Sequence, residues 1–487
     1  MTEKKQHLEE AKELSMGYFL TGMVILLIAT LLGFLKRLSQ TGIIEFRATS
    51  WYTLMTLHGM AAFVGGGVFL CMGLTWYVLV NVLDKPLHST KLVKLGYYIF
   101  MTGVALIVIA TLFGNYAASW VFLHPLSFEA AGAWDNWAVI VWVLGVICAG
   151  VAILIVEFEV LLTIKSAGYS IINAVGVEAL APEPEGGYKT PVVLVPFAVN
   201  AVGMIIATIP FAGLLIAFLL QGFGLVSNID ALLAKNILWW FGHPVVYALL
   251  FPSAGFGYYM VERLTGGKII GERLTKIAWF VAVAVQNIIG SHHVYQDLVN
   301  PLPVHVSQQI LTYAITIPSL ASLYVIIGTL YLRKFEWDIS AKFLFLSILG
   351  WILAGLSGVV NATIFWNVYI HNTLWIVAHF HAMAILNIMM MLAAISYFLI
   401  RDYTGTELYN EKLARIGMWH IYIGVMGFVH MWFIQGIMGG IRRSMTSTPN
   451  LGLYTWLSIP FALAALIGFW LSVFVILKTI QNGKQNE

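Results

Sequence analysis

The sequence is short of charge. Only 10% of its 487 residues are Asp, Glu, Lys or Arg, whereas soluble domains carry about 25%, and 60% are hydrophobic. The mean hydropathy is +0.85. This composition excludes a soluble domain and indicates a polytopic membrane protein.

Cysteine, repeats and low-complexity tracts are also scarce. Cys71 and Cys148 lie in apolar segments, and two isolated cysteines provide neither a disulfide framework nor a paired-cysteine metal site. We interpret them as small packing residues. With no repeat visible, we expect one continuous transmembrane domain over residues 1–487. The longest polar insertion, 165–190, contains Pro-Glu-Pro-Glu-Gly-Gly and is interpreted as a solvated cytoplasmic loop.

Long apolar runs are abundant. A helix needs about 20 apolar residues to cross a hydrocarbon core of ~30 Å. The sequence therefore predicts an all-α bundle of about twelve transmembrane helices. They are placed near 17–35, 53–83, 95–115, 136–164, 195–222, 236–260, 276–292, 307–332, 343–365, 373–400, 414–440 and 456–480.

The cations give an orientation. With both termini in the cytoplasm, twenty of the 26 Lys and Arg residues fall on the inner side, which is the positive-inside bias of membrane proteins. The net charge of +3 therefore reflects topology and not nucleic-acid binding. Residues 1–15 lack the apolar core of a signal peptide, so we expect the first span to be retained.

Two histidines separated by one phenylalanine, His379-Phe380-His381, lie in an apolar segment. On an α-helix residues i and i+2 point roughly 200° apart, so both rings cannot bind one metal. They either serve two centres or are two packing histidines that happen to be close. Ionisable groups inside membranes are rare and usually functional, and imidazole is a common ligand of iron and copper.

Other histidines are predicted at the same depth, in the outer part of the membrane: His58, His243, His292 and His293. Chance placement would scatter six histidines from four helices. By contrast, His420 and His430 are interpreted as core histidines satisfied by neighbours, and His7 and His88 as solvated.

The spacing within this set of histidines indicates a metal site. His243 and Tyr247 are i and i+4 on one helix, so a phenol lies beside an imidazole. His292 and His293 would project about 100° apart at a helix end, which suits two ligands of one metal. With His243 they give a three-imidazole site with an open position. Copper, zinc or iron fit such a site, and the redox-capable phenol favours copper.

These residues carry a family resemblance. The segments Trp240–Tyr247, Ser291–His293 and His371–His381, in this order, resemble the catalytic subunit I of the heme–copper oxygen reductases. The resemblance implies that His58 and His381 bind a low-spin heme, that His379 binds a high-spin heme, and that His243, His292 and His293 bind the copper called CuB. Tyr247 resembles the family's tyrosine that is cross-linked to the first copper ligand, here His243.

Within the family the chain is most similar to the B-type branch. The A-type branch has a proton-relaying glutamate directly after His-Pro, where this chain has Val245. Tyr258, Ser319 and Ser322 occupy positions like those of the single B-type proton pathway that leads to Tyr247, although such serines usually bond to their own backbone. Glu157 and Glu159 are interpreted as interfacial residues outside any pathway.

On the outer side, Arg442 and Arg443 resemble the arginine pair that binds heme propionates, and His371 resembles a residue near those propionates. The chain departs from the family pattern at two positions, one in the local turn and one on the proton exit route. The family commonly has proline before the pair, where this chain has Ile441, and B-type members often have a carboxylate at the position of Asn367.

The resemblance implies a terminal respiratory oxidase that reduces O2 to water and translocates protons across a prokaryotic plasma membrane. A separate subunit II carrying CuA is implied because this chain has no suitable cysteine cluster; cytochrome c or a small copper protein would donate electrons, and a quinol donor stays open. The alternatives are a nitric oxide reductase on the same scaffold, against which Tyr247 argues, and a heme-free transporter with proton-relaying histidines.

Overall fold

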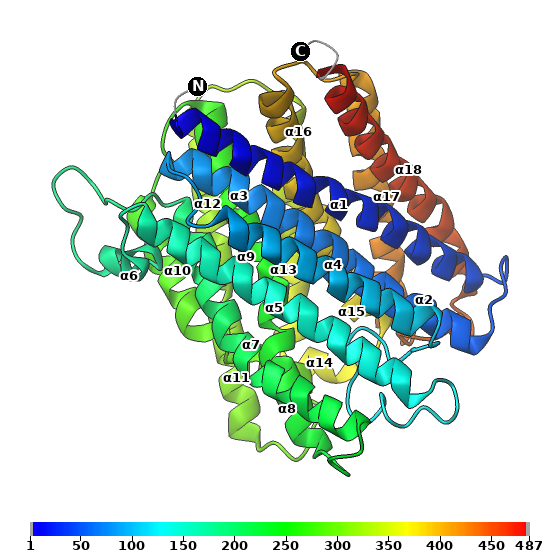
Figure 1. Cartoon of the computed structure of the whole chain (residues 1–487). Coiled ribbons are helices and arrows are strands. Elements are labelled where there is room, and N and C mark those ends of the chain that lie inside the picture. Colours follow the sequence, from blue (N-terminus) through cyan, green and yellow to red (C-terminus); the bar gives the residue numbers. More distant parts are fainter. Residues whose placement is uncertain (1–2, 484–487) are drawn as a thin grey trace. The chain divides into compact units, whose positions relative to one another are not determined.

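The structure is a computed structural model that describes residues 3–483, apart from the side chains of residues 3–5 and 7. All secondary-structure elements in this range are helices, apart from an isolated β-bridge between Thr373 and Ile441. Figure 1 labels the helices along the chain. The α-helices are α1 (Glu3–Ser39), α2 (Ala48–Gly59), α3 (Phe69–Leu83), α4 (Thr90–Leu112), α5 (Asn136–Ser166), α6 (Ile171–Ala174), α7 (Leu194–Gly222), α8 (Ala231–Gly242), α9 (Pro244–Thr265), α10 (Glu272–Val285), α11 (Leu302–Ala314), α12 (Thr316–Leu332), α13 (Ile339–Ala362), α14 (Ile364–Ile370), α15 (Leu374–His381), α16 (Met390–Thr404), α17 (Glu411–Ile437) and α18 (Gly452–Gly483). Two π-helices, η1 (Met60–Val68) and η4 (Ala382–Met389), and two 3-10 helices, η2 (Val177–Leu180) and η3 (Ile289–Val294), complete the set.

Among the described residues, eleven helical segments are long and apolar enough to cross a membrane. The predicted all-α, multi-span fold is confirmed, with one span fewer than the predicted twelve. The difference lies at 276–292, where α10 has only 14 residues and is followed by η3. The side chains of Gln286 and Asn287 donate to the carbonyls of Val199 and Gly203 in α7, at 3.1 and 2.9 Å. These bonds to α7 anchor the segment in which α10 stops and η3 begins.

The chain forms two compact units. The first comprises Met1–Ala29, Arg47–Gly255 and Gly271–Ser322, and the second comprises Thr30–Phe46, Phe256–Ile270 and Leu323–Glu487. Helices α1, α9 and α12 each contribute residues to both units. The single domain expected over residues 1–487 and the cytoplasmic location of both termini stay predictions.

In the first unit, α4 packs along α5, and α5 along α7 (Figure 1). Aromatic rings fill the core between them. Tyr116 stacks on Trp142 with ring centroids 4.6 Å apart, and Phe211 stacks on Phe241 at 4.2 Å. Such buried rings combine a large apolar area with defined geometry, which fixes how the helices pack.

The predicted cytoplasmic loop 165–190 is more ordered than a solvated loop, because it contains α6 and η2 and is anchored on α10. The anchor is Lys276, whose side chain is fully buried. Its ammonium group donates to the carboxylate of Glu178 and the carbonyl of Thr190, each at 2.7 Å, and pairs with Glu272. Local sequence patterns could not reveal this partner because it lies almost 100 residues from Glu178.

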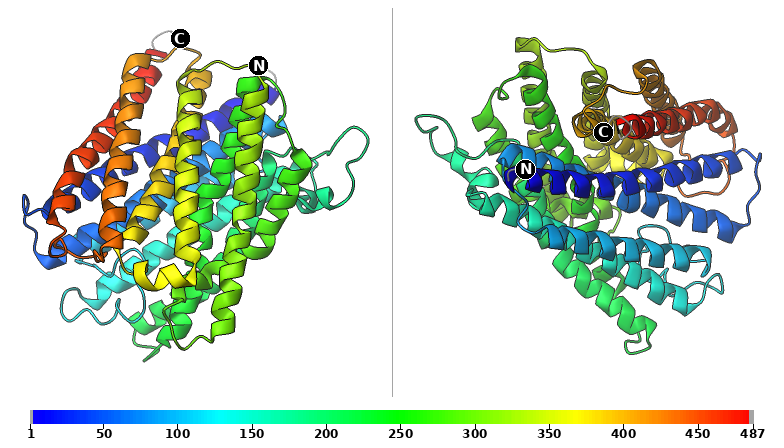
Figure 2. Two further views of the ribbon diagram at one scale, coloured as in Figure 1. Left: turned by 180° about the vertical axis from the view of Figure 1, so that it is seen from behind. Right: turned by 45° about the horizontal axis from the view of Figure 1, so that its top comes forward.

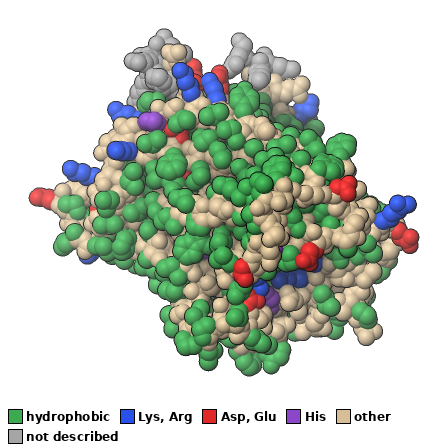
Figure 3. Space-filling model, turned by 60° about the horizontal axis from the view of Figure 1, so that its bottom comes forward, with side chains coloured by type: hydrophobic (Ala, Val, Ile, Leu, Met, Phe, Trp, Pro, Cys, Tyr) green, Lys and Arg blue, Asp and Glu red, His purple; other side chains and the backbone are tan. Residues whose placement is uncertain are grey.

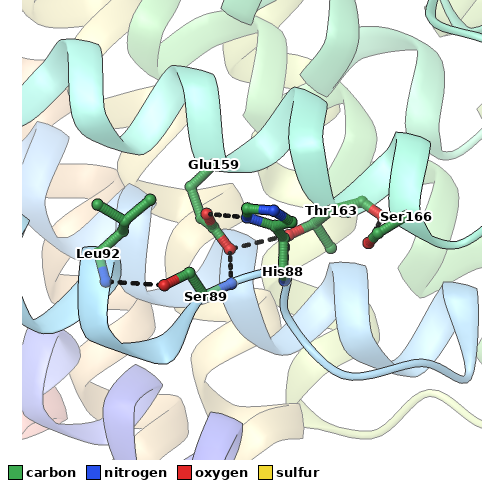
Figure 4. A network of polar contacts seen from close by, with 6 residues as sticks. All are labelled: His88, Ser89, Leu92, Glu159, Thr163 and Ser166. Atoms are coloured by element: carbon green, nitrogen blue, oxygen red, sulfur yellow. Dashed lines mark hydrogen bonds and ion pairs between the residues drawn. The ribbon is translucent and has the colours of Figure 1, made fainter.

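The turn between α3 and α4 is held by Glu159 of α5, as Figure 4 shows. The carboxylate accepts hydrogen bonds from the backbone N–H of Ser89 at 2.5 Å, the hydroxyl of Thr163 at 3.3 Å and the ring of His88 at 3.2 Å. Glu159 is fully buried and Glu157 is 5% exposed, so both carboxyl groups are enclosed by protein. Their interfacial depth in the membrane stays a prediction. His88 is also not simply solvated, since its half-exposed ring is paired with Glu159.

In the second unit, α17 lies along α18, and α13 packs against η4 and α16 (Figure 2). Ser347 of α13 donates to the backbone carbonyl of Asn387 at 2.9 Å. This bond crosses from α13 to the π-helical stretch, where the wider helical turn breaks the regular ladder. Single π-helical stretches inside α-helices frequently mark functional sites.

Large hydrophobic side chains cover much of the surface, and Figure 3 shows one face on which they predominate. Phe113 is 75% exposed and Tyr331 is 86% exposed, as expected for side chains that face lipid. His420 and His430 are exposed as well, each bonded to the backbone carbonyl four residues earlier. The interpretation of His420 and His430 as core histidines was therefore wrong.

Candidate metal centre

His243 lies at the junction of two helices. Helix α8 ends at Gly242 and α9 begins at Pro244, which has no N–H with which to continue the α8 ladder. The N–H of His243 still donates to the carbonyl of Trp239, at 3.2 Å, so the two helices form one 35-residue candidate span. The side chain of His243 is 7% exposed. A histidine at this break is therefore held in the interior of its unit by continuous helix on both sides.

His292 and His293 lie on η3, which passes close to the end of α8. Contact is close because Gly290 has no side chain: a Cβ at this position would lie 2.4 Å from the carbonyl oxygen of Trp239. The ring of His293 stacks on the indole of Trp239 with centroids 3.9 Å apart and planes at 10°. The indole thus sets the plane of one imidazole, and the glycine sets the distance between η3 and α8.

The three imidazoles converge. One nitrogen from each of His243, His292 and His293 lies within 4.8 Å of the others. The Nδ1 of His243 is 3.2 Å from the Nε2 of His293. Two nitrogens that are each about 2.0 Å from one metal ion lie roughly 2.8–3.5 Å apart for bond angles of 90–120°. The distance between His243 and His293 falls in this range, and the structure brings all three imidazoles together. Their role as copper ligands stays a prediction.

The phenol of Tyr247 lies next to His243. Its hydroxyl is 2.6 Å from the Nε2 of His243, as the i, i+4 spacing predicts. The ring stacks on Phe251 with centroids 4.3 Å apart and is 6% exposed. With Nε2 turned toward the phenol, Nδ1 is the nitrogen of His243 that can bind a metal.

A hydrogen bond that sequence reasoning missed orients His292. Its Nδ1 donates to the hydroxyl of Thr312 at 2.9 Å, and that hydroxyl in turn donates to the carbonyl of Gln308. The bond fixes the tautomer in which Nε2 of His292 carries the lone pair. No signal in the sequence pairs α11 with η3, because the contact depends on how the two segments pack.

His379 and His381 face different helices of the second unit, as their spacing predicts. His379 donates from Nδ1 to the hydroxyl of Ser357 in α13, at 2.9 Å. The ring of His381 instead contacts Trp432 of α17, edge to face at 4.8 Å, and its Nδ1 donates to the carbonyl of Val377 at 2.8 Å. Each ring therefore leaves Nε2 as the nitrogen that can bind a metal, on opposite sides of α15.

His58 of α2 shows the same arrangement. Its Nδ1 donates to the carbonyl of Ala29 in α1, at 2.8 Å. The same kind of bond occurs at the exposed His420 and His430, so it does not by itself identify a ligand. A second feature distinguishes His58 and His381: a π-helix begins close behind each. Helix η1 begins at Met60, two residues after His58, and η4 begins at Ala382, directly after His381. The common depth predicted for all six histidines stays a prediction.

Arg442 and Arg443 lie beside the start of α15. The N–H of Arg442 donates to the carbonyl of Asn372, its guanidinium donates to the side chain of Asn372 at 3.0 Å, and Leu374 N–H donates to the carbonyl of Gly440. Arg443 has the left-handed φ of 62°, so the turn forms with Ile441 in place of proline. Burial and the adjacent cation Arg443 lower the pKa of Arg442 to about 10. An anion would stabilise this pair. His371, which precedes Asn372, ends α14.

The structure gives the surroundings of each predicted proton-pathway residue. Tyr258 is fully buried in α9. Ser322 is buried in α12 and donates to the carbonyl of Pro318, which is the backbone bond common for such serines. Ser319 is half-buried. Their role as a pathway stays a prediction.

Comparison with known proteins identifies the family. The family model described as "Cytochrome C and Quinol oxidase polypeptide I" matches residues 13–474. The chain belongs to the heme–copper oxidase subunit I family. A solved structure of a heme–copper terminal oxidase dimer has the same fold, with a TM-score of 0.81 at 20% identity over 96% of this chain and 84% of that chain.

Curated relatives of this heme–copper oxidase subunit are distant. Cytochrome c oxidase subunit 1 of Thermus thermophilus is 26% identical over 54% of this chain and 50% of its own length. The heme-copper oxidase subunit I+III of Aeropyrum pernix is 24% identical over 89% of this chain and 52% of its own. Quinol oxidase subunit 1 of Bacillus subtilis is 24% identical over 84% and 61%. The chain thus spans about half the length of the first relatives it matches.

Proposed function

We propose that this subunit reduces O2 to water at a site formed by a high-spin heme and CuB, and that turnover is coupled to proton translocation. The observation that carries the proposal is the group of three imidazoles, spaced for one metal ion, with the phenol of Tyr247 at 2.6 Å from His243. Membership of an oxidoreductase family of heme- and copper-containing membrane proteins supports it.

The donor set fits the groups that the family implies. His243 through Nδ1, and His292 and His293 through Nε2, would hold CuB. His379 would bind the high-spin heme iron, and His58 and His381 the low-spin heme iron. When bound, these metals would supply the electrons and the position at which oxygen reacts.

Tyr247 would supply a proton and an electron to the reaction. Its hydroxyl is already within hydrogen-bonding distance of His243, so a proton can move without rearrangement. Burial keeps water away from the phenol. Reductive cleavage of the O–O bond needs four electrons, and a buried redox-active phenol completes the number that two metals provide.

Protons would reach Tyr247 from the cytoplasm. Val245, in place of a carboxylate, is buried and cannot relay a proton, which supports assignment to the B-type branch. Tyr258, Ser319 and Ser322 are proposed as the uptake pathway. Arg442 and Arg443 would bind heme propionates through bidentate guanidinium contacts. His371 would lie close to these propionates, because it precedes Asn372, whose side chain accepts a hydrogen bond from Arg442.

The subunit would work in a prokaryotic plasma membrane with a subunit II that carries CuA. The relatives' names include both cytochrome c oxidases and quinol oxidases. We propose cytochrome c or a small copper protein as the donor, because the cytochrome c oxidase of Thermus thermophilus is among the relatives. Turnover supported by reduced cytochrome c, and not by quinol, would be the expected result with the purified complex.

The decisive test is Tyr247→Phe. This change removes only the hydroxyl and leaves the ring that stacks on Phe251. We expect oxygen uptake to fall at least about 100-fold, since acid–base groups contribute 10²–10⁴-fold, while both hemes stay bound in reduced-minus-oxidised spectra. Nitric oxide consumption is measured in parallel.

Tyr397→Phe is the matched control, because it removes another buried phenol, one that bonds the carbonyl of Ser472. It should keep near-normal uptake. Near-normal oxygen uptake in Tyr247→Phe would remove the tyrosine from the mechanism, and nitric oxide consumption without oxygen uptake in the native complex would contradict the proposed reaction.

A further inference from the structure

A small cavity lies within the first unit, apart from the histidine group. Helices α3, α5, α7 and α9 and the π-helix η1 line it. The cavity volume is about 20 Å³. One water molecule needs roughly 10–15 Å³ by the same measure, so the cavity can hold one. Its polar lining comprises Thr75, Glu157 and Asn200, with Cys71 as the one other titratable group among the lining residues.

Glu157 is an unusual carboxyl group for the interior of a membrane protein. It is 5% exposed, and its Oε1 accepts one hydrogen bond, from the Nδ2 of Asn200 at 2.8 Å. No cation lines the cavity. Burying a carboxylate with so little compensation is costly, so intramembrane carboxyl groups of this kind are functional by default.

Two oxygen atoms at the cavity can accept a hydrogen bond from water. Asn200 is 3% exposed, and its Oδ1 has no hydrogen-bond partner. Pro252 of α9 has no N–H, so the carbonyl of Ala248, four residues earlier, loses its usual helical donor, and both residues line the cavity. A water molecule placed there could donate to both oxygens and accept a proton from Glu157. Two to four such partners are typical for buried water.

Glu159, the other carboxyl group in this part of α5, has a structural role and serves as a comparison. Glu159, two residues along, accepts from Ser89, Thr163 and His88 and does not line the cavity (Figure 4). Its hydrogen-bonding capacity is used to hold a turn. Glu157 has one partner and a cavity beside it, so packing of the turn does not explain it.

We propose that Glu157, Asn200 and one bound water form a buried proton-accepting site on the uptake side of the oxygen-reducing centre. Ala248 and Pro252 follow Tyr247 on α9, which places the site on the cytoplasmic side of the phenol in the predicted topology. Glu157 takes up a proton through the water and later releases it, with no change in redox state. The role in turnover rests on the proposed oxygen reduction, whereas the proton exchange does not.

The first test uses infrared difference spectroscopy of the purified, oxidised complex in H2O and D2O. A protonated, water-exchanging carboxyl group should give a C=O stretching band that shifts in D2O. We expect Glu157→Gln to remove this band and Glu159→Gln, the matched control in the same helix, to keep it. A band that persists in Glu157→Gln, or a Glu157 band that does not shift in D2O, would overturn the proposal.

The second test measures turnover. In Glu157→Gln we expect the kcat for oxygen to fall at least about tenfold, with KM for oxygen, both heme spectra and the copper content unchanged. A wild-type kcat would refute the role in uptake. If the native complex consumes no oxygen, the proposed function is wrong. The infrared experiment then still shows whether Glu157 exchanges its proton with water.

A third variant tests the proposal if Glu157→Gln does not fold. Asn200→Leu keeps the carboxyl group but removes the unpartnered oxygen and fills the cavity. If Glu157→Gln does not retain its hemes, Asn200→Leu decides the question: the C=O band should persist while its shift in D2O slows or disappears. An unchanged shift would refute the bound water.

Discussion

Gly290 controls the distance between the two parts of the proposed copper site. In Gly290→Ala the new Cβ would lie 2.4 Å from the carbonyl oxygen of Trp239 and 3.4 Å from the Cβ of His243. Cβ contacts under 3.0 Å are essentially never found, and ordinary contact begins at 3.4 Å. The backbone of η3 must therefore move away from α8 by about 0.6–1.0 Å.

This displacement acts on the metal ligands directly, because His292 and His293 follow Gly290 by two and three residues. The distance between Nδ1 of His243 and Nε2 of His293, now 3.2 Å, would open toward roughly 4 Å, beyond the span that one copper ion bridges. A misplacement of about 1 Å can lower a catalytic rate about 100-fold, and overpacking typically destabilises a fold by about 1–3 kcal/mol.

We expect Gly290→Ala to lose copper and to reduce oxygen uptake about 100-fold while retaining both hemes. Metal analysis of the purified complex gives copper per heme, optical spectra give the hemes, and an oxygen electrode gives uptake. Gly213→Ala is the control, since nothing lies within 4 Å of a Cβ at that helical position. A Gly290→Ala complex with native copper content and native uptake would refute the steric argument.

Two further substitutions test contacts found in the structure. Ser357→Ala removes the acceptor for Nδ1 of His379, and loss of such an orienting partner typically costs about 10–100-fold in metal affinity or activity. We expect weaker binding of the high-spin heme, seen as a smaller signal in carbon monoxide difference spectra. Ser396→Ala, which removes a hydroxyl that bonds its own helix, should leave this signal unchanged. Lys276→Met leaves the carboxylates of Glu178 and Glu272 without their buried cation and should destabilise the fold by about 3–5 kcal/mol, seen as a lower Tm. Lys94→Met breaks an exposed pair with Glu10 and should change Tm little, and equal Tm values for the two variants would contradict the importance of burial.

Much of the fold follows from local properties of the chain. Hydrophobic runs of membrane-spanning length predict the helices, because a span must satisfy its backbone hydrogen bonds internally. Helical spacing also predicts the contact between His243 and Tyr247 and the two faces occupied by His379 and His381. These relations lie within a few residues of one helix, so geometry alone transmits them from sequence to structure.

Other features depend on helices that are remote in sequence. Helix α10, in the seventh predicted span, ends at Val285, next to Gln286 and Asn287, whose side chains bond to α7. Thr312 orients His292 from another helix. The position of Glu157 near the inner end of a span predicts an interfacial residue, and only the packing of α3, α7 and α9 shows that protein encloses its carboxyl group. Eleven of the twelve predicted spans, the family and the likeness of each histidine to a ligand follow from the local sequence. Tertiary structure decided which nitrogen of each ring can bind a metal and which carboxyl group lines a cavity, because both depend on distances between helices that no local pattern encodes.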